Sequence, residues 1–124
     1  MIFNNTQPIF VQIADYVAEL ILRKELLPDQ QIPSVRELAV KLEVNPNTVM
    51  RAFERLQLNE VVYNKRGMGY FVAPGAYEKI LNQRKSRLFE EILPGIYDEM
   101  ELLGITDTEL TAHHKTYAKL KKQC

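Results

Sequence analysis

The sequence is poor in features that mark several large classes of protein. It has no tryptophan, a single cysteine at its last position (Cys124), and no apolar run of about eighteen residues that could span a membrane. One cysteine excludes an intrachain disulfide and a cysteine-based metal cluster, and we expect Cys124 to be a solvated bystander. Residues 1–6 lack the basic-then-apolar layout of a signal peptide, so we expect a cytoplasmic protein with no membrane partner.

Catalytic motifs are missing as well. The chain has no glycine-rich phosphate loop, no nucleophile elbow and no serine–histidine–acid set, and its only serines are Ser34 and Ser86. Glu109 and His113 have the spacing of a metal-ligand pair on a helix, but one pair is an incomplete site. The neighbouring His114 would point about 100° away from His113. We therefore expect no enzyme, no metal site and no cofactor.

The balance of charge does not indicate a nucleic-acid partner. The formal net charge of the chain is zero, and residues 1–75 carry eight Lys and Arg against eight Asp and Glu. A strongly basic domain attracts nucleic acids through its overall field, and this chain lacks that field. Binding to DNA would therefore depend on where the cations lie and not on their number.

The most informative stretch of the chain contains two helix starts. Ser34 with Glu37 has the pattern of a capping box, and Asn45 followed by Pro46 is an N-cap with proline at the first helical position. Residues 42–44 between the two helices leave room only for a tight turn. Two short helices joined in this way form the helix-turn-helix arrangement, which lays its second helix in the major groove of DNA.

Apolar periodicity predicts three helices in the first half of the chain. They span about residues 8–26, 34–42 and 45–58, with Pro8 in the first turn of the first helix and Thr6 or Gln7 as its cap. The residues expected to be buried are Ile9, Ile13, Tyr16, Val17, Leu20 and Ile21 in the first helix, Val35, Leu38, Ala39 and Leu42 in the second, and Val49, Ala52, Phe53 and Leu56 in the third. The remaining face of the third helix carries Asn47, Thr48, Arg51 and Arg55. Such a face suits a contact in a DNA groove, and it also suits an ordinary solvated surface, on which Arg55 would be an ion-pair partner.

Two β-rich runs follow the third helix. Residues 61–64 and 69–73 flank Lys65-Arg66-Gly67-Met68, which predicts a β-hairpin with a glycine-assisted turn. A hairpin after a helix-turn-helix is the wing of a winged helix, so Lys65 and Arg66 are placed to meet phosphates or a minor groove. A basic loop that keeps a sheet edge soluble is the simpler alternative.

The chain after Pro74-Gly75 is predicted to be a helical tail. One apolar stripe runs to about residue 103 and contains Tyr77, Leu81, Leu88, Ile92, Ile96, Met100 and Leu103. Pro94-Gly95 should kink or split this helix, and Thr106 with Glu109 opens a last helix that extends to about residue 121.

Two helices with one thin apolar stripe make a poor core by themselves. The stripe must therefore pack on the first domain or on a second copy of the chain. We expect a second copy, because helix-turn-helix proteins usually bind two half-sites as dimers. The expected dimerisation residues are Leu81, Leu88, Ile92, Ile96, Met100 and Leu103. A groove for a small molecule is a further alternative.

These observations predict a mainly α protein with a small β-hairpin (α+β). A winged helix-turn-helix DNA-binding domain over residues 1–75 would precede a two- to three-helix dimerisation tail over residues 76–124. The expected function is that of a sequence-specific, DNA-binding transcription regulator. One alternative is a winged-helix module used only for protein contacts, although aromatic residues would be favoured at such an interface. Another is a tail that also binds a small-molecule effector or a protein partner.

Five short motifs follow one another between residues 8 and 73. They are Pro8-Ile9-Phe10-Val11-Gln12-Ile13, Leu26-Leu27-Pro28, Ile32-Pro33-Ser34-Val35-Arg36-Glu37-Leu38-Ala39, Val44-Asn45-Pro46-Asn47-Thr48-Val49, and Arg66-Gly67-Met68-Gly69-Tyr70-Phe71-Val72. In this order they resemble the winged-helix domain of the GntR family of bacterial transcription regulators. The short tail resembles the YtrA subfamily, whose members lack the large effector domains of other branches. The resemblance implies a homodimer joined through the tail, usually a repressor and often of transporter genes, and we expect it to bind a pseudo-palindromic operator.

The resemblance also implies roles for individual residues. The arginine of the Pro-Ser-x-Arg-Glu-Leu motif, Arg36, would touch DNA phosphates. The start of the recognition helix would contact bases and phosphates, and its residues here are Asn45, Asn47 and Thr48, followed by Arg51. The wing would enter the minor groove with Arg66 and Gly67, next to Lys65.

Three positions depart from the family's pattern. Lys24 and Asp29 stand where the family usually carries glycines, so we expect the turn before the second helix to be built differently. Met50 stands where many relatives carry an arginine. We therefore expect a base preference that differs from that of those relatives.

Overall fold

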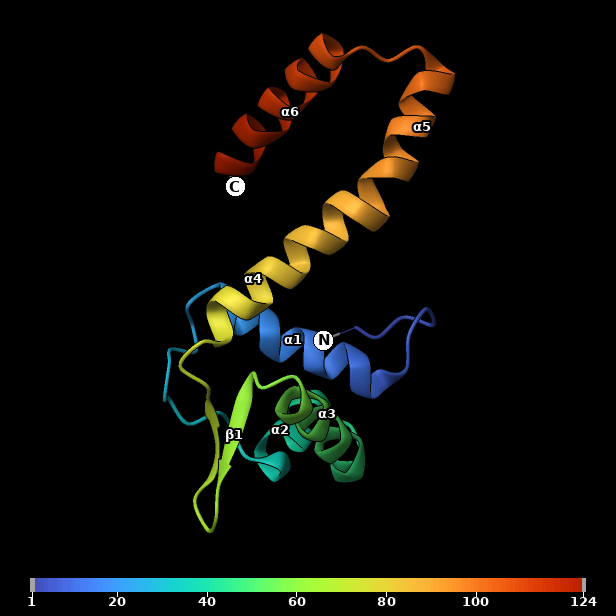
Figure 1. The fold of residues 1–124 in the computed structure, drawn as a ribbon. Coiled ribbons are helices and arrows are strands. Elements are labelled where there is room, and N and C mark those ends of the chain that lie inside the picture. The colour runs from blue at the N-terminus through green and yellow to red at the C-terminus, as the bar shows by residue number, and fades with distance from the viewer. Residues whose placement is uncertain (1, 124) are drawn as a thin grey trace. The chain divides into compact units, whose positions relative to one another are not determined.

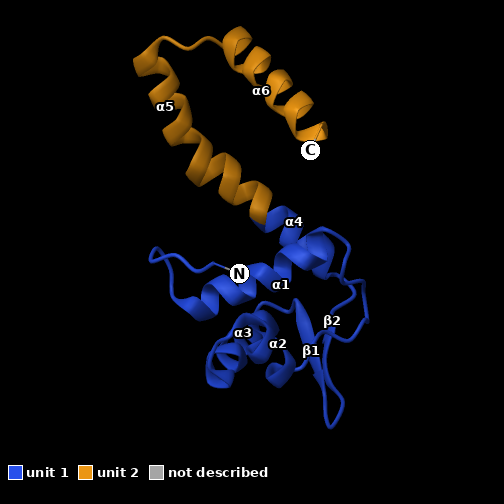
Figure 2. Ribbon diagram, turned by 180° about the vertical axis from the view of Figure 1, so that it is seen from behind, with its two compact units in different colours: residues 1–83 blue, residues 84–124 orange. Residues whose placement is uncertain are grey.

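The computed structural model describes residues 2–123 and divides the chain into two compact units, residues 1–83 and residues 84–124 (Figure 2). Cys124, expected to be a solvated bystander, lies outside the described residues. None of the helices within residues 2–123 has the length and apolar character that crossing a membrane requires. We refer to residues 1–83 as unit 1 and to residues 84–124 as unit 2.

Unit 1 consists of helices that lie beside a β-hairpin, whose tip extends beyond them (Figure 1). Its elements are α1 (Ile9–Leu22), α2 (Val35–Leu42), α3 (Pro46–Leu58), β1 (Val62–Lys65), β2 (Gly69–Val72) and the first part of α4 (Ala76–Arg87). Helices α1 and α2 both pack on α3, which is therefore the central element of the unit. The core contains Ile13, Val17, Ile21, Leu38, Leu42, Val49, Phe53, Leu56, Val62, Val72, Ala76 and Ile80.

The two predicted helix starts are confirmed. The Ser34 hydroxyl accepts a hydrogen bond from the Glu37 N–H (3.1 Å), and the Glu37 carboxylate accepts one from the Ser34 N–H (3.2 Å). The Asn45 side chain accepts a hydrogen bond from the Asn47 N–H (2.8 Å), and Pro46 follows at the first helical position. The two caps satisfy backbone donors that would otherwise lack partners, so they fix where each helix begins.

Helix α1 is shorter than predicted at its C-terminal end. It ends at Leu22, not at residue 26, because Lys24 adopts a left-handed conformation (φ 61°) that a helix cannot continue through. The N–H groups of Glu25 and Leu26 both donate to the Leu20 carbonyl (3.0 and 3.2 Å), which closes the helix end.

The N-terminal end of α1 also differs from the prediction. Pro8 is the capping residue itself (φ −55°, ψ 147°) with no side-chain cap, and Ile9, expected to be buried, is 45% exposed. The side chain of the buried Gln12 forms hydrogen bonds with the backbone of the segment before the helix. Its amide donates to the carbonyls of Asn4 and Gln7 (both 2.9 Å), and its side-chain oxygen accepts from the Asn4 N–H (3.0 Å).

Four residues other than glycine lie in the left-handed region of backbone space within the described chain: Lys24, Asp29, Glu43 and Glu60, with φ between 56° and 62°. This conformation favours glycine. Lys24 and Asp29, which stand where the family usually carries glycines, thus both adopt a conformation that favours glycine. The expectation that the turn before α2 is built differently stays a prediction.

The predicted wing is confirmed as an antiparallel hairpin. Strands β1 and β2 pair from Val62↔Val72 to Lys65↔Gly69, and Gln31 adds an isolated bridge to Phe71 on the other edge of β2. The turn closes with a hydrogen bond from the Met68 N–H to the Lys65 carbonyl (2.9 Å). Gly67 has a φ of 79°, which explains why glycine stands at the tip.

Unit 2 contains the end of α4, a π-helical turn η1 (Leu88–Ile92), α5 (Leu93–Leu103) and α6 (Asp107–Lys122). The predicted break near Pro94 is confirmed, since the π-helical turn directly precedes α5 and Pro94 lies in the first turn of that helix. Gly104 ends α5 in a left-handed conformation (φ 68°). The Thr106 hydroxyl then caps α6 by accepting from the Glu109 N–H (3.2 Å).

Candidate nucleic-acid interface

The first turn of α3 presents polar side chains next to the turn of the helix-turn-helix. Asn45 and Asn47 are exposed, and Thr48 is half-buried against the unit. The side-chain oxygen of Asn45 is occupied by the cap, so its NH₂ group is the part that can meet a ligand. Asn47 offers both a donor and an acceptor at an exposed helix start, where a recognition helix contacts base edges.

Arg51 is exposed, but its guanidinium is drawn to one side of α3. The guanidinium carbon lies 4.2 Å from the centre of the Phe10 ring, which belongs to α1. Such a cation–π contact at an exposed site is worth about 0.5–1 kcal/mol. Arg51 therefore lies on the α1 side of the recognition helix and can leave this contact at modest cost.

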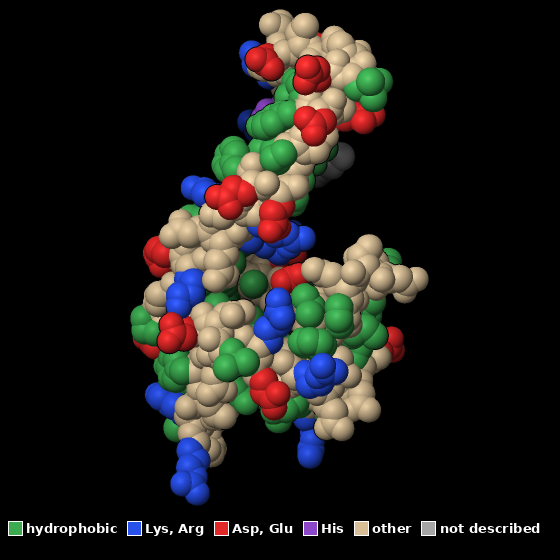
Figure 3. Space-filling view, turned by 45° about the vertical axis from the view of Figure 1, so that its right-hand side comes forward, with side chains coloured by type: hydrophobic (Ala, Val, Ile, Leu, Met, Phe, Trp, Pro, Cys, Tyr) green, Lys and Arg blue, Asp and Glu red, His purple; other side chains and the backbone are tan. Residues whose placement is uncertain are grey.

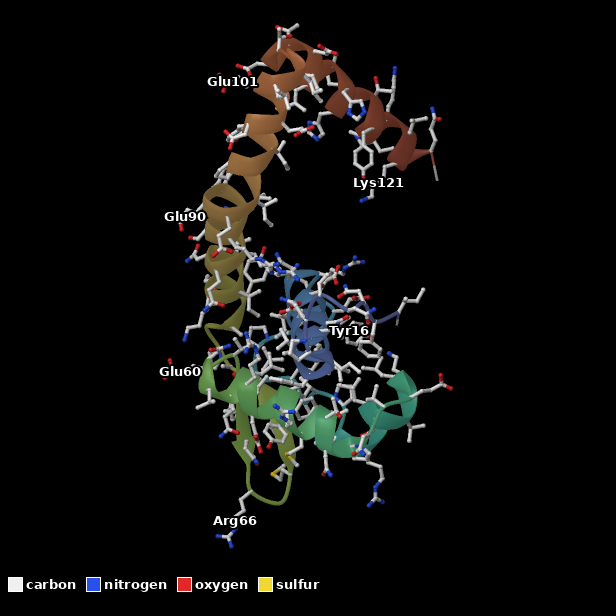
Figure 4. All side chains as sticks on the ribbon, turned by 90° about the vertical axis from the view of Figure 1, so that its right-hand side faces the viewer. Tyr16, Glu60, Arg66, Glu90, Glu101 and Lys121 are labelled. Atoms are coloured by element: carbon white, nitrogen blue, oxygen red, sulfur yellow. The ribbon has the colours of Figure 1, made fainter. Side chains whose placement is uncertain are left out.

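The wing presents its cations at the tip of the hairpin. Arg66 points away from the end of the turn (Figure 4), and Lys and Arg side chains project from the lower edge of unit 1 in Figure 3, including at this hairpin tip. The Lys65 ammonium lies 4.9 Å from the centre of the Phe71 ring. Gly67, without a side chain, lets the backbone of the tip approach a narrow groove closely.

Arg36 lies in the first turn of α2 and is exposed. The helix-turn-helix crosses the DNA backbone with its first helix, so an exposed cation there suits a phosphate. Unit 1 thus brings together the predicted DNA-contacting residues from α2, α3 and the wing: Arg36, Asn45, Asn47, Thr48, Arg51, Lys65, Arg66 and Gly67. Their assignment to DNA stays a prediction.

The structure adds two contacts that sequence reasoning missed. The Tyr70 hydroxyl on β2 donates to the Met50 sulfur on α3 (3.8 Å), and the Gln31 amide donates to the Met68 carbonyl in the wing turn (2.6 Å). A β-carbon at Gly69 would lie 3.1 Å from that Gln31 amide nitrogen, so glycine allows the close approach. Both contacts join residues far apart in the chain, and no local pattern signals them.

A hydrogen bond also links β1 to the turn after α1. The Tyr63 hydroxyl donates to the Asp29 carboxylate (2.8 Å), and this hydrogen bond, followed by desolvation, raises the pKa of Tyr63 above its ordinary value. The Tyr63 ring stacks on the Phe71 ring with a centroid distance of 5.7 Å. The left-handed turn at Asp29 is therefore connected to the base of the wing.

The predicted dimerisation residues fall in both units. Leu81 lies in unit 1 and is half-buried, whereas Leu88, Ile92, Ile96 and Leu103 lie in unit 2 and are exposed. Met100 is buried. Within the described part of unit 2, an apolar stripe is thus left mostly open to solvent.

No grouping of three or more His, Cys, Asp or Glu side chains within residues 2–123 could hold a metal ion. Leu110, Thr111, His113, His114 and Tyr117 line a shallow surface pocket, and all of them belong to α6. A pocket lined by one helix does not enclose a small molecule.

Comparisons with known proteins agree with this picture. A family model described as bacterial regulatory proteins, gntR family, matches residues 10–72. YhcF of Bacillus subtilis (strain 168), described as an uncharacterized HTH-type transcriptional regulator, is 38% identical over 94% of this chain and 95% of its own length. The HTH-type transcriptional repressor YtrA of the same organism is 31% identical over 77% of this chain and 73% of its own length.

Solved structures are similar over one or both units. A GntR family transcriptional regulator from Listeria monocytogenes covers 92% of this chain and 98% of its own, with a TM-score of 0.77 and 34% identity. The DNA-binding domain of AraR, in complex with operator ORR3, covers 59% of this chain and 88% of its own, with a TM-score of 0.54 and 29% identity. The family resemblance and the winged helix-turn-helix fold predicted from the sequence are both confirmed. The matched family and relatives are transcription regulators, not enzymes.

Proposed function

This chain belongs to the GntR family of bacterial regulatory proteins and is a transcription regulator with a DNA-binding domain, and from that premise we propose that it represses transcription as a homodimer on a pseudo-palindromic operator. The observation that carries the proposal is the grouping, in unit 1, of a capped polar helix start on α3 with a basic wing tip. The AraR domain, which shares this fold, is seen with operator DNA.

We assign the contacts by the chemistry of each side chain. Arg36, Lys65 and Arg66 are exposed cations that suit phosphates, which position a protein on DNA without selecting sequence. Asn47 and Thr48, at the start of α3, suit base edges in the major groove. The Arg51 guanidinium lies on the Phe10 ring, and we propose that it leaves this ring to contact a phosphate when DNA binds.

The apolar stripe of unit 2 supports a homodimer. On a regular α-helix each four-residue step turns the stripe by about 40°, so the steps from Leu88 through Ile92 and Ile96 to Met100 would carry it round the helix. The π-helical turn over Leu88–Ile92 holds more residues per turn and offsets part of that drift. A straighter stripe suits a second copy of the same surface better than it suits a small molecule, for which α6 offers open, one-sided pockets.

The repressor role draws support from relatives. YtrA is named a repressor and aligns over 77% of this chain. A bound regulator that covers a promoter blocks it by occupancy alone, and this requires nothing beyond the DNA-binding unit and dimerisation. We propose no effector.

Selection of bound fragments from a random pool of duplex DNA tests the DNA-binding part of the proposal. We expect an enriched motif with two-fold symmetry and half-sites separated by one helical turn or a multiple of it. Light scattering after size-exclusion chromatography should give twice the mass of one chain. A reporter placed behind the selected operator should lose expression when the protein is present. An unenriched pool would overturn operator binding, a single unpaired half-site would overturn the dimer, and increased reporter expression would overturn repression.

A further inference from the structure

The two sides of the recognition helix carry different side chains. Arg51 lies toward α1, on the Phe10 ring. Met50 lies on the side toward the wing, where it meets Tyr70 of β2, and it is 38% exposed. Met50 also lies three residues after Asn47, so the two are neighbours on the helix surface. The exposed surface of α3 therefore presents the Met50 thioether beside the Asn47 amide, whereas the Arg51 guanidinium lies against Phe10 of α1.

The side chain of Met50 is held in place. Tyr70 donates its hydroxyl hydrogen to the Met50 sulfur at 3.8 Å, the distance of a weak sulfur-accepted hydrogen bond. Tyr70 is itself fixed, because its ring packs edge-on against the fully buried Phe53 with a centroid distance of 5.0 Å. The Tyr70 carbonyl also accepts a hydrogen bond from the Ile32 N–H (2.9 Å). Methionine is the most flexible apolar side chain, so this support reduces the entropy that a contact would cost.

A methionine at this place cannot pair with most base edges in the major groove. A thioether has no hydrogen atom to donate to the acceptors of guanine and adenine. Its sulfur is a weak acceptor that already receives the Tyr70 hydroxyl, so it is a poor partner for the amino groups of adenine and cytosine. Thymine differs because it presents the C5-methyl group, which apolar side chains contact.

We propose that Met50 is a specificity-determining residue that contacts the C5-methyl of a thymine in each half-site, with Tyr70 as the residue that positions it. This inference rests on the proposed operator binding and adds a base to it. Because each chain of the homodimer contacts one half-site, the two-fold operator carries one such thymine in each half-site. Replacement of Met50 by arginine changes the favoured base at that position to guanine, whose two acceptors arginine pairs with.

A methyl scan of the operator tests the proposal with the full-length protein. In the operator selected by the wild-type chain, each thymine is replaced in turn by deoxyuridine, which removes only the methyl group. We expect one position in each half-site where wild-type affinity falls roughly fourfold, as the burial of one methyl group implies. At this position Met50→Ala should bind the two duplexes equally, and Tyr70→Phe, which keeps the ring on Phe53, should lose part of the discrimination.

A matched control is available on the same helix. Leu58 is an apolar residue of α3 that is 84% exposed and lies at the end of the helix away from its first turn. Leu58→Ala should lose affinity at the same thymine positions, and by the same factor, as the wild type does when deoxyuridine replaces thymine. Selection with Met50→Arg should replace the sensitive thymine by guanine and leave the other positions of the motif as they are.

The outcomes separate the two proposals. If the wild-type chain selects no motif, operator binding itself fails. If it selects a motif but no thymine is sensitive to methyl removal, or if the sensitive thymine stays sensitive in Met50→Ala, the role of Met50 is wrong and operator binding stands. An unchanged motif for Met50→Arg likewise overturns the role of Met50 alone. Circular dichroism spectra equal to that of the wild type show that the variants are folded.

Discussion

Glu43 ends α2 in a left-handed conformation (φ 56°, ψ 49°) at the turn of the helix-turn-helix. Its N–H donates to the Val40 carbonyl (3.3 Å), and the next N–H, of Val44, donates to the Ala39 carbonyl (3.0 Å). These are backbone contacts that glycine would keep, and the Glu43 side chain is exposed. Glu43→Gly therefore removes a side chain from a strained backbone position and changes little else in the folded state, so we expect it to stabilise the protein.

The size of this effect follows from two opposing terms. The left-handed conformation costs a residue with a β-carbon about 1–2 kcal/mol, which glycine does not incur. Glycine also gives the unfolded chain more freedom, which costs about 0.5–1 kcal/mol on folding. The net stabilisation is about 0.5–1 kcal/mol. For a folding unit of about 60–100 residues, such as unit 1, this raises the Tm by about 2–8 °C.

Differential scanning calorimetry of the wild type, Glu43→Gly and Glu43→Ala measures this effect. Alanine also removes the carboxylate but keeps the β-carbon, so the difference between the two variants isolates the backbone term. We expect Glu43→Ala to stay near the wild type and Glu43→Gly to melt higher. Equal Tm values for the two variants would refute the reasoning, because a charge effect would then account for any change.

Three further predictions concern the interface, the wing and the tail. Arg36→Ala should weaken binding about equally on all operators and lower the steepness of log affinity against log salt concentration by about one. An unchanged slope would show that Arg36 does not contact a phosphate. The Tyr63 pKa should lie above its ordinary value of about 10, and Asp29→Asn should lower it in an ultraviolet titration. Because the pKa of Tyr63 is raised in the folded state, the stability that this hydrogen bond contributes is present below the unfolded pKa and is lost as pH rises through the folded pKa. A Tm that does not change as pH rises through the folded pKa would contradict this contribution. Ile96→Asp should convert the dimer to a monomer in light scattering while the circular dichroism spectrum of unit 1 persists, and a dimer of unchanged mass would argue against the stripe.

The helix starts could be predicted from the sequence because their causes are local. Ser34 with Glu37, and Asn45 with Pro46, complete their hydrogen bonds or fix their backbone within a few residues. The end of α1 could not be predicted in this way. Lys24 continues the helical pattern as a side chain, and only its left-handed backbone stops the helix.

The candidate site was predicted in part for the same reason. Exposed polar residues at the start of α3 and cations in a glycine turn are visible in the sequence as local patterns. The contacts from Arg51 to Phe10 and from Met50 to Tyr70 join elements that meet only after folding. The sequence places Arg51 after the first turn of the recognition helix and shows Met50 as a departure from the family's pattern, but the partners of both side chains, Phe10 and Tyr70, are visible only in the folded chain.

The recognition helix is supported from both sides, and this bears on how it could bind DNA. Phe10 of α1 lies against Arg51, and Tyr70 of β2 lies against Met50 and the buried Phe53. A helix held between two elements needs no rearrangement of its backbone on binding, so the ordering cost falls on side chains alone. Arg51 would give up a contact worth about 0.5–1 kcal/mol to reach a phosphate, whereas Met50 is already in place. The wing and the recognition helix should therefore engage the operator as one preformed surface, in which Met50, together with Asn47 and Thr48, supplies sequence preference and the cations supply position.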